Sequence, residues 1–211
     1  MKTDELISLL AQDSPVRTHL GASLALALAG GAAAALALLG GTIGLRPDLA
    51  SAVETSRVLF KISFTLLLAV LAGWMLFRVG RPGLKLRPRL RLLLLPLGLL
   101  LLAVSAELVV LPRARWMECL EGLHASFCLF FIPLVSVAPL VAILWALRGT
   151  APADPGLAGA AAGLAAGAIG AAVYALHCPD DSPLFIATWY GLAILIVSAT
   201  GYVAGRRLLR W

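Results

Sequence analysis

Charged residues are scarce in this chain. They make up 13% of its 211 residues, whereas 61% of the residues are hydrophobic. Soluble domains carry about 25% charged residues and are roughly half apolar. The composition therefore excludes an ordinary water-soluble domain and points to a protein that is largely embedded in a membrane.

Recognisable catalytic and metal-binding motifs are also missing. The three cysteines form no C-x-x-C pair and have no zinc-type spacing, which excludes zinc ribbons and thioredoxin-like redox motifs. The sequence contains no phosphate-binding glycine loop, no paired catalytic carboxylates and no Ser/His/Asp order. We therefore expect that the protein is not an enzyme.

Six long apolar runs take up most of the chain. A membrane-spanning helix needs about 20 mostly apolar residues, and lipid leaves the backbone no outside hydrogen-bond partner. The expected spans are Leu20–Leu39, Val58–Phe77, Leu92–Leu111, Ser126–Leu147, Gly156–Leu176 and Leu184–Ala204. The predicted fold is an all-α membrane protein, a bundle of six transmembrane helices with short loops. Residues 20–211 form this domain and residues 1–19 a cytoplasmic segment with a short helix, because Met1–Leu10 lacks the apolar core of a signal peptide.

The distribution of Lys and Arg predicts the orientation. Twelve of the 17 basic residues fall on the side of the N-terminus: Lys2, Arg17, Arg78, Arg81, Lys85, Arg87, Arg89, Arg91, Arg148, Arg206, Arg207 and Arg210. The positive-inside rule therefore places both termini in the cytoplasm. The loop Arg78–Arg91 fits an anchor on anionic lipid or a docking surface for an acidic partner. The net charge of +6 is explained by this anchoring, so we expect lipid contact and no direct nucleic-acid contact.

Thiols and imidazoles gather on the opposite, outer side. Cys119, Cys128 and Cys178 all fall at or near the outer ends of spans, accompanied by His124, His177, Asp180 and Asp181. Disulfides persist outside the cytoplasm, and thiolates with imidazoles suit thiophilic metals. Plainer explanations are buried small cysteines, interfacial histidines and turn-forming aspartates. We expect no obligatory cofactor and at most a transient thiophilic metal ion.

Two features inside the apolar runs predict close helix packing and weigh against a transporter. Gly159, Gly163 and Gly167 recur every four residues, a spacing that lets helix backbones approach closely. Lys61 and Glu107 lie near the outer ends of their spans, where Lys61 can snorkel to the surface. Ionisable residues at mid-membrane, which mark ion paths, are lacking, and this weighs against a transporter.

The segment Met1–Arg17 has the pattern of a short amphipathic helix. Its apolar face is formed by Leu6, Ile7, Leu9 and Leu10. Such a helix could lie on the lipid surface, but its polar residues are mainly acidic, and anionic lipid does not attract them. We therefore favour a protein-binding segment.

Several tracts give the chain a resemblance to a known family. They are the opening MKTDELISLLAQD, GLRPDLA (Gly44–Ala50), CLFFIPLVSVAPL (Cys128–Leu140), LRGTAP (Leu147–Pro152), YALHCPDDSPLFIATWYGLAI (Tyr174–Ile194) and the closing GRRLLRW. Over nearly its full length the chain resembles the NrsF family, six-span inner-membrane anti-sigma factors of bacteria. The resemblance implies an extracytoplasmic-function sigma factor as partner. It also implies that Cys128 and Cys178 are a functional pair whose family counterparts respond to heavy-metal stress, whereas Cys119 does not match this pair.

The residues and the resemblance together predict a membrane-bound anti-sigma factor of the bacterial inner membrane. It sequesters the sigma factor through its cytoplasmic face and releases it when outward-facing cysteines meet heavy-metal or oxidative stress. The auxiliary sensing residues are His124, His177, Asp180 and Asp181. The alternatives are a membrane thiol oxidoreductase, against which the missing C-x-x-C counts, and a small transporter.

Overall fold

The computed structural model describes residues 20–79, 91–150 and 152–210. The predicted amphipathic helix with Leu6, Ile7, Leu9 and Leu10 lies outside these residues, as does most of the basic loop between the second and third spans.

Within the described residues, six helices are long and apolar enough to cross a membrane, with mean hydropathies between 1.7 and 2.6. They contain α2 (Leu20–Thr42), α4 (Ser56–Val79), α6 (Leu94–Val110), α8 (Ala125–Leu147), α9 (Pro155–Tyr174) and α11 (Gly191–Leu208). The shorter elements are α3 (Leu49–Ala52), η1 (Arg91–Leu93), η2 (Arg113–Arg115), α7 (Trp116–Glu121), α10 (Pro183–Phe185) and η3 (Ile186–Tyr190). The prediction of an all-α bundle with six membrane-spanning helices is confirmed.

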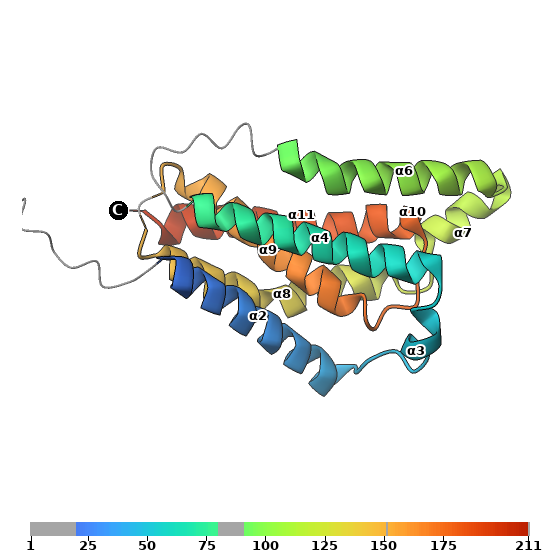
Figure 1. Ribbon diagram of the computed structural model, residues 1–211, viewed down its shortest axis with the longest axis horizontal. Coiled ribbons are helices and arrows are strands. Elements are labelled where there is room, and N and C mark those ends of the chain that lie inside the picture. The colour runs from blue at the N-terminus through green and yellow to red at the C-terminus, as the bar shows by residue number, and fades with distance from the viewer. Residues whose placement is uncertain (1–19, 80–90, 151, 211) are drawn as a thin grey trace, which may run out of the picture.

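Helix α9 forms the centre of the bundle and packs against α2, α4, α8 and α11 (Figure 1). Its first residues favour a helix start, because Asp154 accepts hydrogen bonds from the backbone N–H groups of Gly156 (2.8 Å) and Leu157 (3.0 Å). Pro155 occupies the first helical turn, where its missing N–H costs nothing. Most of the remaining residues of α9 are Ala or Gly, which permits close approach of its neighbours.

The closest helix contact joins α9 to α11. Gly159 and Gly163 of α9 meet Gly201 and Gly205 of α11 backbone to backbone. A Cβ atom added to Gly163 would lie 2.5 Å from the carbonyl oxygen of Val197, closer than real atoms approach. The glycine repeat therefore acts as predicted, and the structure identifies α11 as the partner helix.

Helix α6 lies at the periphery of the bundle, alongside α4 (Figure 1). Only 11% of its membrane-crossing window is buried, against 67% for α9. Its two buried residues are Pro96 and Glu107. Most of the surface of this helix therefore faces away from the other described helices.

The two ends of the bundle differ in charge. One end, here called the basic end, carries a single acid among the described residues, Asp154, and these arginines: Arg78, Arg91, Arg148, Arg206, Arg207 and Arg210. The other end, here called the cysteine end, is formed by α3, α7 and α10 (Figure 1). It carries most of the described acids: Asp48, Glu54, Glu107, Glu118, Glu121, Asp180 and Asp181. The candidate site lies at the cysteine end.

Candidate functional site

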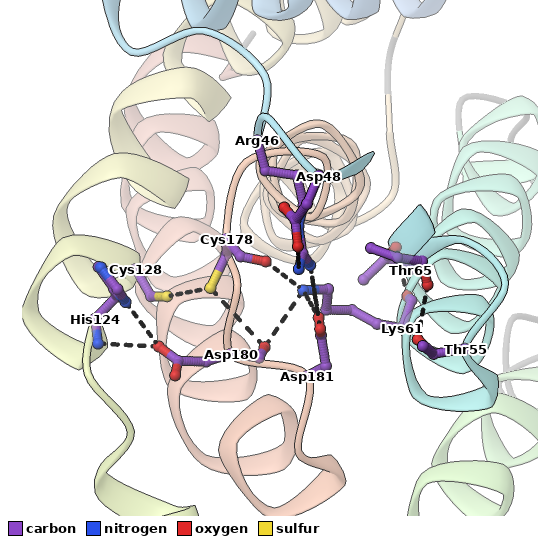
Figure 2. Close-up of polar contacts among 11 residues, drawn as sticks. Arg46, Asp48, Thr55, Lys61, Thr65, His124, Cys128, Cys178, Asp180 and Asp181 are labelled. Atoms are coloured by element: carbon purple, nitrogen blue, oxygen red, sulfur yellow. Dashed lines mark hydrogen bonds and ion pairs between the residues drawn. The ribbon is translucent and has the colours of Figure 1, made fainter. Parts of the chain in front are cut away.

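Two cysteines from different elements meet at the cysteine end. Cys128 lies in the first turn of α8, and Cys178 lies in the loop between α9 and α10. Their sulfur atoms are 3.6 Å apart (Figure 2). A disulfide bond is about 2.05 Å long, so these are two thiols in contact, not a disulfide. The structure thus brings together the two residues that the resemblance paired.

The thiol pair is buried among apolar and aromatic side chains. Both cysteines are 0% exposed. The rings around them include Tyr174, which stacks on Phe131 at a centroid distance of 6.3 Å and lies 6.1 Å from Tyr190. Tyr190 ends η3, a single π-helical turn that precedes α11. Such turns occur frequently at functional sites.

Lys61 of α4 reaches into the loop that carries Cys178. Its ammonium group donates hydrogen bonds to the carbonyl oxygens of Cys178 (2.7 Å) and Asp180 (3.3 Å), and it pairs with the carboxylate of Asp181. The side chain is fully buried. The expectation that Lys61 snorkels to the surface is therefore wrong, because carbonyl oxygens and a carboxylate within the protein replace water around its charge.

Arg46 joins the loop between α2 and α3 to the same network. Its guanidinium donates two hydrogen bonds of 2.8 Å to Asp48 and one of 3.1 Å to Asp181 (Figure 2). The hydrogen bonds to Asp48 raise the pKa of Arg46, and in turn they hold the pKa of the Asp48 carboxyl below its usual range. The backbone N–H of Arg46 also donates to the carbonyl of Leu176, 3.1 Å away.

The two predicted histidines make hydrogen-bond contacts with a backbone carbonyl and a carboxylate. Nδ1 of His177 lies 2.9 Å from the carbonyl oxygen of Gly44. The carboxylate of Asp180 accepts the backbone N–H groups of Leu123 (3.2 Å) and His124 (2.9 Å), and Nδ1 of His124 lies 3.2 Å away. These contacts fix the loop of Cys178 to α2 and to the start of α8.

The predicted auxiliary residues therefore hold the loop of Cys178 in place around the thiols. Among the described residues, no three His, Cys, Asp or Glu side chains converge as a metal site would require. The chemistry offered at the centre is that of two thiols, which can bind a soft metal ion or form a disulfide. The roles of His124, His177, Asp180 and Asp181 as ligands stay predictions.

The electrostatic surroundings activate one of the two thiols. The hydrogen bond with Cys128 lowers the pKa of Cys178, burial opposes this, and the Lys61 ammonium group also lowers it, so that the pKa is about 7. The thiolate of Cys178 is thereby favoured in the folded chain. The thiolate is the form that attacks oxidants and binds metals.

A buried carboxylate links the same loop to α6. Oε2 of Glu107 accepts hydrogen bonds from the hydroxyl of Ser182 (2.7 Å) and the backbone N–H of Leu184 (3.0 Å). Its other oxygen lies 3.3 Å from the guanidinium of Arg57 on α4, and the Glu107 side chain is 3% exposed. Sequence reasoning placed Glu107 near a membrane surface but found no signal for these partners, which lie 75 and 77 residues further along the chain.

Cys119 is more exposed than the thiol pair. It lies in α7 and lines a polar cavity of about 400 Å³. Arg57 of α4 and the loop of Cys178, through Asp180 and Asp181, also line this cavity. Cys119 is therefore partly exposed, whereas the thiol pair is buried. The family resemblance likewise did not include Cys119 in the pair.

A family model described as "Negative regulator of sigma F" matches residues 9–211. The chain belongs to the NrsF family. It is 37% identical over 216 residues to the "Anti-sigma-F factor NrsF" of Caulobacter vibrioides (strain NA1000 / CB15N). It is also 36% identical over 214 residues to the "Probable anti-sigma-F factor NrsF" of Azospira oryzae (strain ATCC BAA-33 / DSM 13638 / PS), and each alignment covers 100% of both chains. No solved structure matches this NrsF-family chain.

Proposed function

We propose that this chain is an anti-sigma factor of the bacterial inner membrane that holds an extracytoplasmic-function sigma factor at its cytoplasmic face. Family membership over nearly the full length and the names of both relatives support the regulatory role. The excess of arginine at the basic end supports a cytoplasmic position for that end and for both termini. The cysteine end then faces outward.

The signal in this proposal is heavy-metal or oxidative stress, received by Cys128 and Cys178. The contact of 3.6 Å between the two sulfur atoms is the observation that carries it. An oxidant takes two electrons from the pair, two protons leave, and a disulfide forms. A soft metal ion instead displaces the thiol protons and binds the two sulfur atoms.

The loop of Cys178 can transmit the change to several helices. Disulfide formation draws the sulfur atoms together by about 1.5 Å, to the bond length of about 2.05 Å. The same loop is tied to α4 by Lys61 and to the chain after α2 by Arg46, and its far end is tied to α6 by Glu107. A shift of the loop therefore acts on three spans at once.

The free energy needed to release the sigma factor is modest. A thousandfold loss of sigma-factor affinity corresponds to about 4 kcal/mol of coupling between the two sites. The metal ion or the disulfide must therefore stabilise the conformation that releases the sigma factor, relative to the conformation that binds it, by at least that amount. Bonds formed at the thiol pair are of sufficient strength for this.

Co-purification from membranes tests the proposal. A sigma factor co-expressed from the same organism should co-purify with the wild type and dissociate after treatment with dichromate or cadmium. The Cys128→Ser and Cys178→Ser variants should retain it under both treatments. An untreated wild type that retains no sigma factor would refute the anti-sigma role, and dissociation from both variants would refute the thiol signal alone.

A further inference from the structure

An apolar groove separates α6 from the rest of the bundle. It has a volume of about 590 Å³ and is walled by α4, α6, η3 and α11. Residues from each wall include Phe64, Leu97, Ala187 and Gly191. Among the described residues that line it, Thr188 alone has a polar side chain, and its hydroxyl already donates to the carbonyl of Leu184.

The groove needs an apolar occupant. It lies between helices that cross the membrane, and close-packed interiors do not leave spaces of this size empty. Water is a poor occupant because a stable water needs two to four polar partners, and the described lining offers only the hydroxyl of Thr188. Hydrocarbon chains are the apolar material available at this depth in a membrane.

The charge at one mouth of the groove selects the headgroup. Arg91 begins η1, two residues before Leu93, which lines the groove. Asp154 is the sole acid at this end of the described structure. Arginines between helices near the membrane surface suit an anionic phosphate headgroup.

We propose that this groove binds one acyl chain of an anionic phospholipid, with the phosphate near Arg91. The lipid fills the space between α6 and the bundle and so completes the packing of a helix that protein contacts leave largely bare. The proposal needs a membrane-spanning chain and is independent of the sigma factor and of the thiol chemistry.

The groove also shares a wall with the thiol pair. Phe64, Ile186 and Ile194 line the groove and belong to the same apolar cluster as Cys128 and Cys178. A chain seated in the groove supports this wall from the outside. Loss of the lipid therefore loosens the packing around the thiols.

Glycine substitutions give a matched test of the acyl-chain site. A Cβ atom at Gly191, which lines the groove, would meet no atom within 4 Å, so Gly191→Leu fills the groove without a backbone clash. Gly98 of α6 is equally open but does not line the groove, so Gly98→Leu is the control. The full-length proteins are reconstituted with vesicles of equal phosphatidylglycerol and phosphatidylcholine, extracted, and examined by native mass spectrometry. Wild type and Gly98→Leu should retain one phosphatidylglycerol, and Gly191→Leu should lose about 90% of it.

The headgroup contact has its own variant. Arg91→Gln should reduce the preference for phosphatidylglycerol over phosphatidylcholine about fivefold, which corresponds to roughly 1 kcal/mol for one arginine near the membrane surface. Equal retention by the two glycine variants would overturn the acyl-chain site, and an unchanged preference in Arg91→Gln would overturn the headgroup site. A wild-type dimer that Gly191→Leu converts to monomer would assign the groove to a second copy of the chain instead.

Discussion

The ammonium group of Lys61 lies 2.7 Å from the carbonyl oxygen of Cys178, although 117 residues separate them in the chain. The positive charge of α4 is thereby placed beside the more acidic of the two paired thiols. The reactivity of the thiol pair and the position of a transmembrane helix thus depend on one contact.

The pH dependence of Cys178 follows from its hydrogen bond with Cys128 and also from the nearby charge of Lys61. Its pKa is lowered from an ordinary value of 9.0 to about 7, so the thiolate is favoured in the folded chain. This contribution to the stability of the fold is complete above pH 9 and is lost as the pH falls through 7. The rate of modification by a small neutral thiosulfonate, followed by peptide mass spectrometry, should rise with a midpoint near pH 7. Lys61→Met should move the midpoint upward, whereas Lys61→Arg keeps the charge; identical midpoints in all three proteins would contradict this assignment.

Cys128 and Cys178 should act as one unit. Replacement of either by Ser prevents a disulfide and removes half of a two-thiol metal site, so each variant should hold the sigma factor under stress. The double variant should behave like either single variant, because the second substitution removes nothing further. A transcriptional reporter for sigma activity under cadmium or dichromate measures this. Cys119→Ser is the control and should respond normally, since Cys119 lies in α7 and is not part of the buried pair of sulfur atoms.

The orientation of the bundle is testable through Cys119. Cys178 is fully buried and a poor target for a bulky label, whereas Cys119 is partly exposed beside a surface cavity. A membrane-impermeant maleimide should label Cys119 in intact spheroplasts, because the proposed topology places α7 outside. Labelling that requires lysis would reverse the topology. Cys119→Ser supplies the background signal.

The apolar face of the amphipathic segment should carry much of the sigma-factor contact. Changing Leu6 and Leu10 to Asp removes two apolar side chains, each contributing about 1.5 kcal/mol when buried, so affinity should fall roughly 100-fold. Ser8→Asp adds an acid to the same segment without removing an apolar side chain and serves as the control. Pull-down from solubilised membranes gives the measurement. Wild-type binding by the double variant would show that the contact lies elsewhere. Arg78–Arg91 would then be the next surface to test.

The contact between α9 and α11 should not tolerate a methyl group. Gly163→Ala places a Cβ atom 2.5 Å from the Val197 carbonyl and should cost about 1–3 kcal/mol of unfolding free energy. Gly30 of α2 faces open space, so Gly30→Ala should be neutral or slightly stabilising. Thermal unfolding of both variants in one detergent compares them directly. Equal midpoints would show that the two helices can separate freely.

The helices could be predicted from the sequence more completely than the site. Continuous apolar runs defined all six spans, and the glycine repeat indicated close packing, because both signals are local. The pairing of Cys128 with Cys178 came from the family resemblance, since nothing in their spacing of 50 residues indicates contact. Lys61 and Glu107 were expected near the membrane surface, yet both are buried against the loop of Cys178. Such contacts depend on how helices far apart in the sequence pack together, and a local sequence pattern does not predict this packing.

The burial of the thiol pair affects the timing of its response. Reagents reach Cys128 and Cys178 only when the aromatic wall around them opens, because both sulfur-bearing side chains are 0% exposed. At high reagent concentration the modification rate then equals the opening rate and stops rising with dose. In the proposed mechanism, a brief chemical pulse would modify little protein, whereas a weaker but sustained exposure would accumulate modified protein. The proposed sensor would therefore respond to the duration of a stress.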